Sequence, residues 1–141
     1  MQVLSLKTAF AIVTLALSGC SIAPKSAGPK PVGPSEVHVT MKEFSVAVDR
    51  PSVSAGDVKL IITSTGVITH ELAIENVGAM DEPFESNGEK AEVENIAPGK
   101  TATLVWKLDK PGKYWLACNT KENNVDHFAL GMKTELTVTA P

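Results

Sequence analysis

Residues 112–132 read GKYWLACNTKENNVDHFALGM. This segment holds a strand-like run that ends in Cys118, then a short loop, and then His127 and Met132. Thiolate, imidazole and thioether groups are soft or borderline donors, and two imidazoles with one thiolate and a weak thioether suit copper. The second imidazole has to come from elsewhere in the fold, and His70 follows an apolar strand-like run upstream. We therefore expect a metal site made by His70, Cys118, His127 and Met132.

The sequence from residue 36 onward has the pattern of an all-β domain. Apolar and polar residues alternate over residues 37–41 and again over residues 58–63, as in half-buried strands. The apolar phase changes near Lys42-Glu43, which predicts a bulge or a bend there. Turn signals that contain proline and glycine separate the apolar runs. The pattern predicts an antiparallel β-sandwich of seven to eight short strands.

The N-terminus has the features of an export signal. Residues 1–19 hold a short basic start and an apolar run that is too short to span a bilayer. The run ends at Leu17-Ser18-Gly19-Cys20, which resembles a bacterial lipobox. The resemblance implies cleavage before Cys20 and a lipid on its sulfur, and an ordinary signal peptide is the alternative. We expect residues 20–35 to be the lipidated cysteine with a proline-rich linker, and residues 36–141 to be the folded domain.

The predicted lipid places the protein outside the cytoplasm. We expect an exported chain that Cys20 anchors to a cell membrane, on its periplasmic face or at the cell surface. Ser21 rather than aspartate follows the cysteine, which favours the outer membrane where the source has two membranes. With Cys20 lipidated, Cys118 is the single remaining thiol, and metal ligation explains why an exported protein keeps it.

Length and charge restrict the function classes. The chain has 141 residues, which is enough for one domain, and we expect that domain to be monomeric. It has 13 basic and 16 acidic residues, and a net charge of −3 argues against a nucleic-acid binder. Eight acidic residues lie in residues 71–94, either as a solvated face or as a surface that steers a basic partner.

The sequence resembles the cupredoxin family, which includes plastocyanin, azurin and sulfocyanin. The resemblance rests on the Gly-x-Tyr-x-x-x-Cys … His-x-x-x-x-Met pattern of residues 112–132 and on Gly66-x-x-x-His70, and it covers roughly residues 37–139. Eight residues separate Cys118 from His127, as in the type 1 copper loop of copper nitrite reductases and unlike the shorter loop of small cupredoxins.

The resemblance has implications for fold and function. It implies a Greek-key β-sandwich or barrel and one type 1 copper per chain. It also implies that the ring edge of His127 faces solvent and passes electrons. Phe128, Ala129 and Leu130 would then form part of a docking patch, or pack the loop against the end of the barrel. The expected function is an electron carrier between membrane or periplasmic redox partners, such as a cytochrome or a terminal oxidase or reductase, without substrate turnover.

Two other functions remain open. The first is a copper-binding or copper-delivery protein, in which the metal is the cargo. The second is an accessory subunit of a copper-containing redox enzyme. An enzyme by itself is the weakest interpretation, because catalytic copper needs further histidines and the chain has 3 in all. The third histidine, His38, falls on the polar side of its strand and is expected to face solvent.

Overall fold

The structure is a computed structural model that describes residues 33–141. The predicted signal peptide, Cys20 and the linker as far as residue 32 lie outside the described residues, so those assignments stay predictions. No helix within residues 33–141 is long and apolar enough to cross a bilayer.

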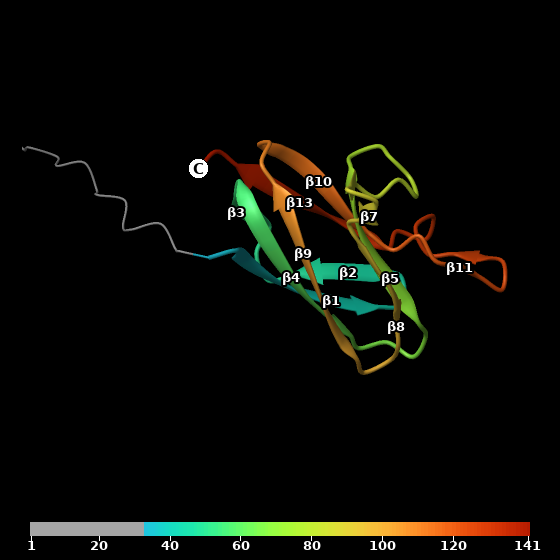
Figure 1. The fold of residues 1–141 in the computed structure, drawn as a ribbon. Helices are drawn as coiled ribbons and strands as arrows, with labels where there is room; N and C mark the ends of the chain where they lie inside the picture. Colours follow the sequence, from blue (N-terminus) through green and yellow to red (C-terminus); the bar gives the residue numbers. More distant parts are fainter. Residues whose placement is uncertain (1–32) are drawn as a thin grey trace, which may run out of the picture. The chain divides into compact units, whose positions relative to one another are not determined.

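Two β-sheets form the body of the domain (Figure 1). The first sheet has the order β2 (Ser45–Val48), β1 (Ser35–Lys42), β4 (Gly56–Ser64) and β9 (Thr101–Leu108). The second has the order β3 (Ser52–Ser54), β13 (Lys133–Thr139), β10 (Gly112–Ala117), β5 (His70–Asn76) and β8 (Glu92–Ile96). Two small hairpins pair β6 (Glu85–Ser86) with β7 (Glu89–Lys90), and β11 (Lys121–Glu122) with β12 (Val125–Asp126).

The prediction of an all-β sandwich is confirmed. The two sheets contain four and five strands, so the total is one or two more than expected. Most neighbours are antiparallel, but β1 pairs with β4 and β13 pairs with β3 in parallel. Parallel neighbours need a crossover connection, and the segment that holds β2 and β3 supplies it between β1 and β4.

Alternation along the strands builds the core between the sheets. In β1 the buried residues are Val37, Val39 and Met41, and in β4 the residues at 58, 60 and 62 are buried in the same way. Side chains two residues apart lie on the same face of a strand, so one face of each strand is apolar and the other polar. Leu116 of β10 and Leu136 of β13 belong to the same core cluster.

β5 is buried on both faces, and residues 82–91 bond to its edge and to Glu75. Leu72 and Ile74 belong to the core, whereas Ala73 and Glu75 have the opposite phase and are also buried. The backbone N–H of Phe84 donates to the carbonyl of Ile74 at 3.0 Å, which attaches this segment to the edge of the strand. Glu75 is therefore not part of a solvated acidic face, although it lies within residues 71–94.

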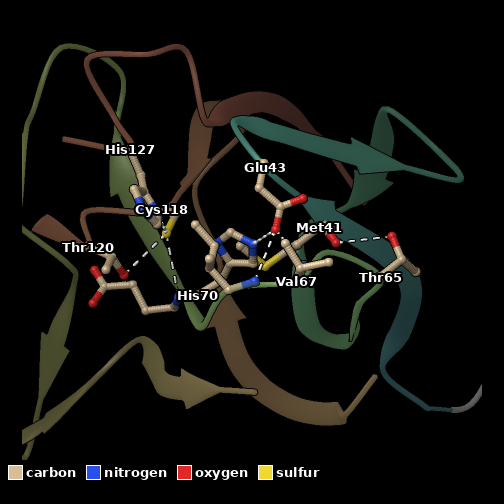
Figure 2. Close-up of polar contacts among 10 residues, drawn as sticks. Met41, Glu43, Thr65, Val67, His70, Cys118, Thr120 and His127 are labelled. Carbon is tan, nitrogen blue, oxygen red and sulfur yellow. Dashed lines mark hydrogen bonds and ion pairs between the residues drawn. The ribbon is translucent and has the colours of Figure 1, made fainter. Parts of the chain in front are cut away.

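Because β5 and β10 are antiparallel, the candidate ligands at the start of β5 and after β10 lie at the same end of the sandwich. Ala73, the fourth residue of β5, pairs with Ala117, the last residue of β10, so the start of β5 and the end of β10 lie at the same end of the sheet. His70 begins β5, and Cys118 directly follows β10. The β1–β2 turn at residues 43–44 and the segment 65–69 after β4 reach the same end of the domain (Figure 2).

Candidate metal centre

Three of the four predicted ligands meet in one buried cluster. One side-chain donor atom each from His70, Cys118 and His127 lies within 4.8 Å of the others. All three residues are buried, and they come from the start of β5, the end of β10 and the loop before β13 (Figure 2). The sheet register thus brings together residues that are 48 and 57 positions apart from His70 in the chain.

The long loop between Cys118 and His127 folds into the β11–β12 hairpin. Asn123 and Asn124 at its tip have φ values of 51° and 65°, as in the type I′ turn that favours two-residue hairpins. The hairpin points away from the sandwich (Figure 1). At its base the N–H of His127 donates to the carbonyl of Thr120 at 3.1 Å. The extra residues are therefore accommodated outside the site, and His127 Nδ1 still lies 3.5 Å from Cys118 Sγ.

The backbone of Met132 is hydrogen-bonded to the backbones of both Cys118 and His127. Its N–H donates to the carbonyl of His127 at 3.0 Å, and its own carbonyl accepts the N–H of Cys118 at 3.0 Å. Gly131 has a φ of 97°, which an L-residue rarely adopts, and this turn leads the chain into β13. The Met132 side chain is fully buried.

Besides His127, the Cys118 sulfur has two polar neighbours among the described residues. The backbone N–H of Glu71 lies 3.5 Å from the sulfur, and the Thr120 hydroxyl lies 3.4 Å from it. Burial raises the pKa of the Cys118 thiol, because a thiolate without a counter-charge is poorly solvated there. A bound cation would supply that counter-charge, so the free, buried thiol suits a metal ligand better than a redox-active cysteine.

Two glutamates hold the chain directly after Cys118. The backbone N–H of Asn119 donates to Glu71 Oε1 at 3.0 Å, and its side-chain amide donates to Glu75 Oε1 at 2.6 Å. Glu75 Oε1 also accepts the N–H of Glu82 at 3.2 Å. Burial raises the pKa of Glu71, and the hydrogen bond from Asn119 opposes that rise. These contacts fix the exit from β10 and restrict movement of the Cys118 sulfur.

His70 is the clearest sign that the cluster is built for a cation. Both of its ring nitrogens are buried without a hydrogen-bond partner among the described residues. Burial lowers the pKa of His70, and the nearby His127 lowers it further, whereas Glu43 raises it. A buried polar atom without a partner costs about 1–3 kcal/mol. A metal bond to one nitrogen would remove that cost, and the thiolate and two imidazoles fit type 1 copper.

The β1–β2 turn closes over the site, which the sequence did not indicate. The pattern predicted only a bend near Lys42-Glu43, and the chain makes a two-residue turn at Glu43 and Phe44. Glu43 Oε1 lies 3.8 Å from His70 Nε2. The ring of Phe44 meets the ring of His127 edge to face, with centroids 5.4 Å apart. Each imidazole therefore has one neighbour from this turn.

Two expectations about the surface near His127 are wrong. The His127 ring edge does not face solvent, because the residue is 1% exposed and Phe44 packs against it. Phe128 is 8% exposed and is no docking residue, because its ring packs on Trp115 and lies 4.0 Å from Lys133 Nζ. Ala129 and Leu130 are exposed, as the docking prediction requires.

His38 lies apart from the cluster on the exposed side of β1. Its Nε2 is 3.5 Å from Glu36 Oε1, and its side chain is more than half exposed. The prediction that His38 faces solvent is confirmed. It therefore provides a histidine for control experiments outside the metal centre.

Comparisons with known proteins agree with this geometry. The sequence matches the family described as "Cupredoxin-like domain" over residues 8–126. A crystal structure of auracyanin from the photosynthetic bacterium Roseiflexus castenholzii, reduced with sodium dithionite, has 21% sequence identity and a TM-score of 0.55. That similarity covers 76% of this chain and 99% of the auracyanin chain.

A second solved structure has the same fold. Auracyanin B has 19% identity and a TM-score of 0.54, over 80% of this chain and 93% of its own. No curated protein sequence matches the chain significantly. The family match spans most of the chain, and the buried cysteine and two histidines fit one type 1 copper. The chain belongs to the cupredoxin-like domain family.

Proposed function

We propose that the protein is an electron carrier that uses one type 1 copper. Cys118, His70 and His127 would hold the metal, with Met132 as a weak fourth ligand. The observation that carries the proposal is the buried cluster in which both ring nitrogens of His70 lack a hydrogen-bond partner within residues 33–141. When bound, the copper supplies one-electron exchange. The protein then has to keep its ligands in place while the charge of the site changes.

The scaffold around the cluster supports that task. The ligands are attached to the ends of β5 and β10 and to the segment before β13, which are hydrogen-bonded neighbours in one sheet. The backbone bonds of Met132 and the contacts of Asn119 with two glutamates restrict the loop further. Little reorganisation of the ligands is therefore needed during electron transfer.

Electrons would pass between the site and a redox protein across the end of the sandwich that carries Phe44. The Phe44 ring lies between His127 and the surface, and it is 36% exposed. Ala129 and Leu130 are exposed on the loop that follows His127 and would contribute apolar contact area. The partner would be a cytochrome or a terminal oxidase or reductase, and no substrate would be converted. The auracyanin that was reduced with dithionite supports redox activity in this fold.

We further propose that the protein works at a membrane surface. The lipobox-like sequence at Cys20 supports a lipid anchor after export. Prolines in residues 21–35 favour an extended linker of about 3.1 Å per residue, which would let a monomeric domain move between partners. Recovery of Cys20 with an attached lipid, by mass spectrometry of protein from a membrane fraction, is the expected result.

The alternative of copper delivery is less well supported by the site. Delivery requires that the metal leave readily, and all three clustered ligands are buried. A carrier of electrons should keep its copper through repeated oxidation and reduction, whereas a delivery protein should lose it to an acceptor in the Cu(I) state. A test of copper retention over many redox cycles separates the two functions.

The test of the proposed site is the visible and EPR spectrum of the Cu(II) protein. We expect an intense charge-transfer band from the Cys118 thiolate to Cu(II), and a narrow copper hyperfine splitting. Cys118→Ser removes the thiolate and should abolish the band, whereas His38→Ala should leave it unchanged because His38 is outside the cluster. A band that survives Cys118→Ser would show that the ligand assignment is wrong.

A further inference from the structure

We propose that Glu43 is the carboxylate partner of the copper ligand His70, and that its negative charge lowers the reduction potential of the copper. The inference rests on the proposed function, because it concerns the same metal site. Neither the ligand pattern nor the family resemblance points to this residue.

Glu43 is held beside His70 by backbone hydrogen bonds. Its Oε1 accepts the N–H of Val67 at 2.6 Å and the N–H of Ile68 at 3.1 Å. The same oxygen lies 3.8 Å from Nε2 of His70. The Glu43 side chain is 32% exposed and His70 is fully buried, so the carboxylate lies between solvent and the buried ring. The β1–β2 turn thus places a fixed negative charge against the ring.

The arrangement leaves the other nitrogen of His70 for the metal. Figure 2 shows Glu43 and Cys118 on opposite sides of the His70 ring. Glu43 is not a member of the cluster of possible ligands, which contains only His70, Cys118 and His127 among the described residues. Nε2 faces Glu43, so Nδ1 is the nitrogen available for coordination. A metal-bound histidine commonly donates its second N–H to a carboxylate, which fixes the ring and increases its basicity.

The distance decides what kind of contact this is. At 3.8 Å the contact is about 1 Å longer than a hydrogen bond, so its effect is mainly electrostatic. Among the described residues His70 has no other ion-pair partner. A carboxylate near a copper ligand stabilises the more positive oxidation state. Cu(II) is therefore favoured over Cu(I), and the reduction potential falls.

The first experiment replaces Glu43 by glutamine in the full-length copper protein. Glutamine keeps an oxygen that can accept the N–H groups of Val67 and Ile68, but it removes the charge. Loss of a carboxylate that is hydrogen-bonded to a metal-bound histidine typically costs 10–100-fold in metal affinity, and the longer contact of Glu43 should give the lower end of that range. We expect Glu43→Gln to weaken Cu(II) binding about tenfold and to leave Cu(I) binding unchanged. The midpoint potential should then rise by about 59 mV, the equivalent of a tenfold ratio for one electron.

The matched control is Glu122→Gln. Glu122 lies on the exposed β11 strand and forms no ion pair among the described residues. The substitution removes the same charge without touching either histidine. We expect its potential to remain within error of the wild-type value. An equal rise in both variants would attribute the effect to net charge and would overturn the role of Glu43.

A second variant moves the carboxylate without removing its charge. A Cβ atom at Gly66 would collide with the Glu43 carboxylate, and Gly66 does not have the positive φ that alanine avoids. Gly66→Ala should therefore displace the carboxylate from His70, and we expect the potential to rise in the same direction as in Glu43→Gln. This variant also tests the inference if Glu43→Gln folds poorly.

The outcomes separate this inference from the proposed function. The charge-transfer band of the wild-type and variant proteins reports whether the copper site exists. If the band is present and neither Glu43→Gln nor Gly66→Ala raises the potential, Glu43 only braces the segment 65–69 and the inference is wrong. If the wild-type protein has no such band, the proposed copper function fails at an earlier step.

Discussion

At the residue scale, two loop side chains, Phe44 and Thr120, contact the ligands although neither is a ligand itself. Phe44 covers the His127 ring, and Thr120 lies beside the Cys118 sulfur. Phe44 has a φ of 57°, an unfavourable conformation for a bulky residue. Such strained residues cluster at functional sites, where the surrounding structure enforces them. The Thr120 contact is local in sequence and the Phe44 contact is not, and neither could be inferred from the residue type alone.

Thr120 should tune the copper in the direction opposite to Glu43. When Cys118 is a thiolate, the Thr120 hydroxyl can donate to it across 3.4 Å. That bond withdraws charge from the sulfur and favours Cu(I). We expect Thr120→Val to lower the midpoint potential by the equivalent of about 1 kcal/mol, the typical net value of one hydrogen bond. Voltammetry measures this, with the exposed Thr103→Val as the matched control. A rise in potential would contradict the assignment.

At the element scale, the β11–β12 hairpin explains how a long loop is compatible with a compact metal site. Its two strands pair Lys121 with Asp126 and Glu122 with Val125. The bond between Thr120 and His127 closes the hairpin before the ligand is reached. The conformation of the tip is therefore separated from the position of the imidazole. Hairpin stability and copper coordination should respond independently to mutation.

The tip residue Asn124 tests that independence. Its φ of 65° is tolerated by asparagine and by glycine but is unfavourable for a β-branched residue. We expect Asn124→Val to lower the free energy of unfolding by about 1–3 kcal/mol, and Asn124→Gly to change it by less than about 1 kcal/mol. Chemical denaturation measures both variants. The charge-transfer band should be the same in both, and a shifted band would show that the hairpin does position His127.

At the scale of the whole molecule, folding places a protonated thiol and a neutral imidazole together in a buried centre. Burial raises the pKa of Cys118 above its ordinary value of 9.0 and lowers the pKa of His70 below 6.5 in the metal-free protein. Between pH 7 and 8 the thiol is therefore protonated and His70 is neutral. Copper binding requires the thiolate, so it has to displace the thiol proton.

The expected result is a copper affinity that increases with pH. One proton released per copper raises the apparent affinity about tenfold for each pH unit between pH 7 and 8. Calorimetric titration in two buffers of different ionisation enthalpy counts the protons directly. Cys118→Ser should reduce the count by one. An affinity for copper that does not change with pH in the wild-type protein would contradict the proposed thiolate ligand.

The sequence determined the chemistry of the centre and the class of the fold. Alternation in β1 and β4 is a local property, because successive side chains of a strand point to opposite faces. The spacing of Cys118, His127 and Met132 is local too, and His70 was found because it follows an apolar strand. These features need no knowledge of which strands become neighbours.

Only the tertiary structure decided what surrounds the ligands. Packing of the two sheets against each other brings the β1–β2 turn onto the site, so that Glu43 faces His70 and Phe44 covers His127. The bond between Asn119 and Glu75 depends in the same way on segments that are distant in sequence, and Phe128 is buried against Trp115 of the preceding strand. Periodicity reports which face of a strand is apolar, but it carries no information about which distant segment packs against that face.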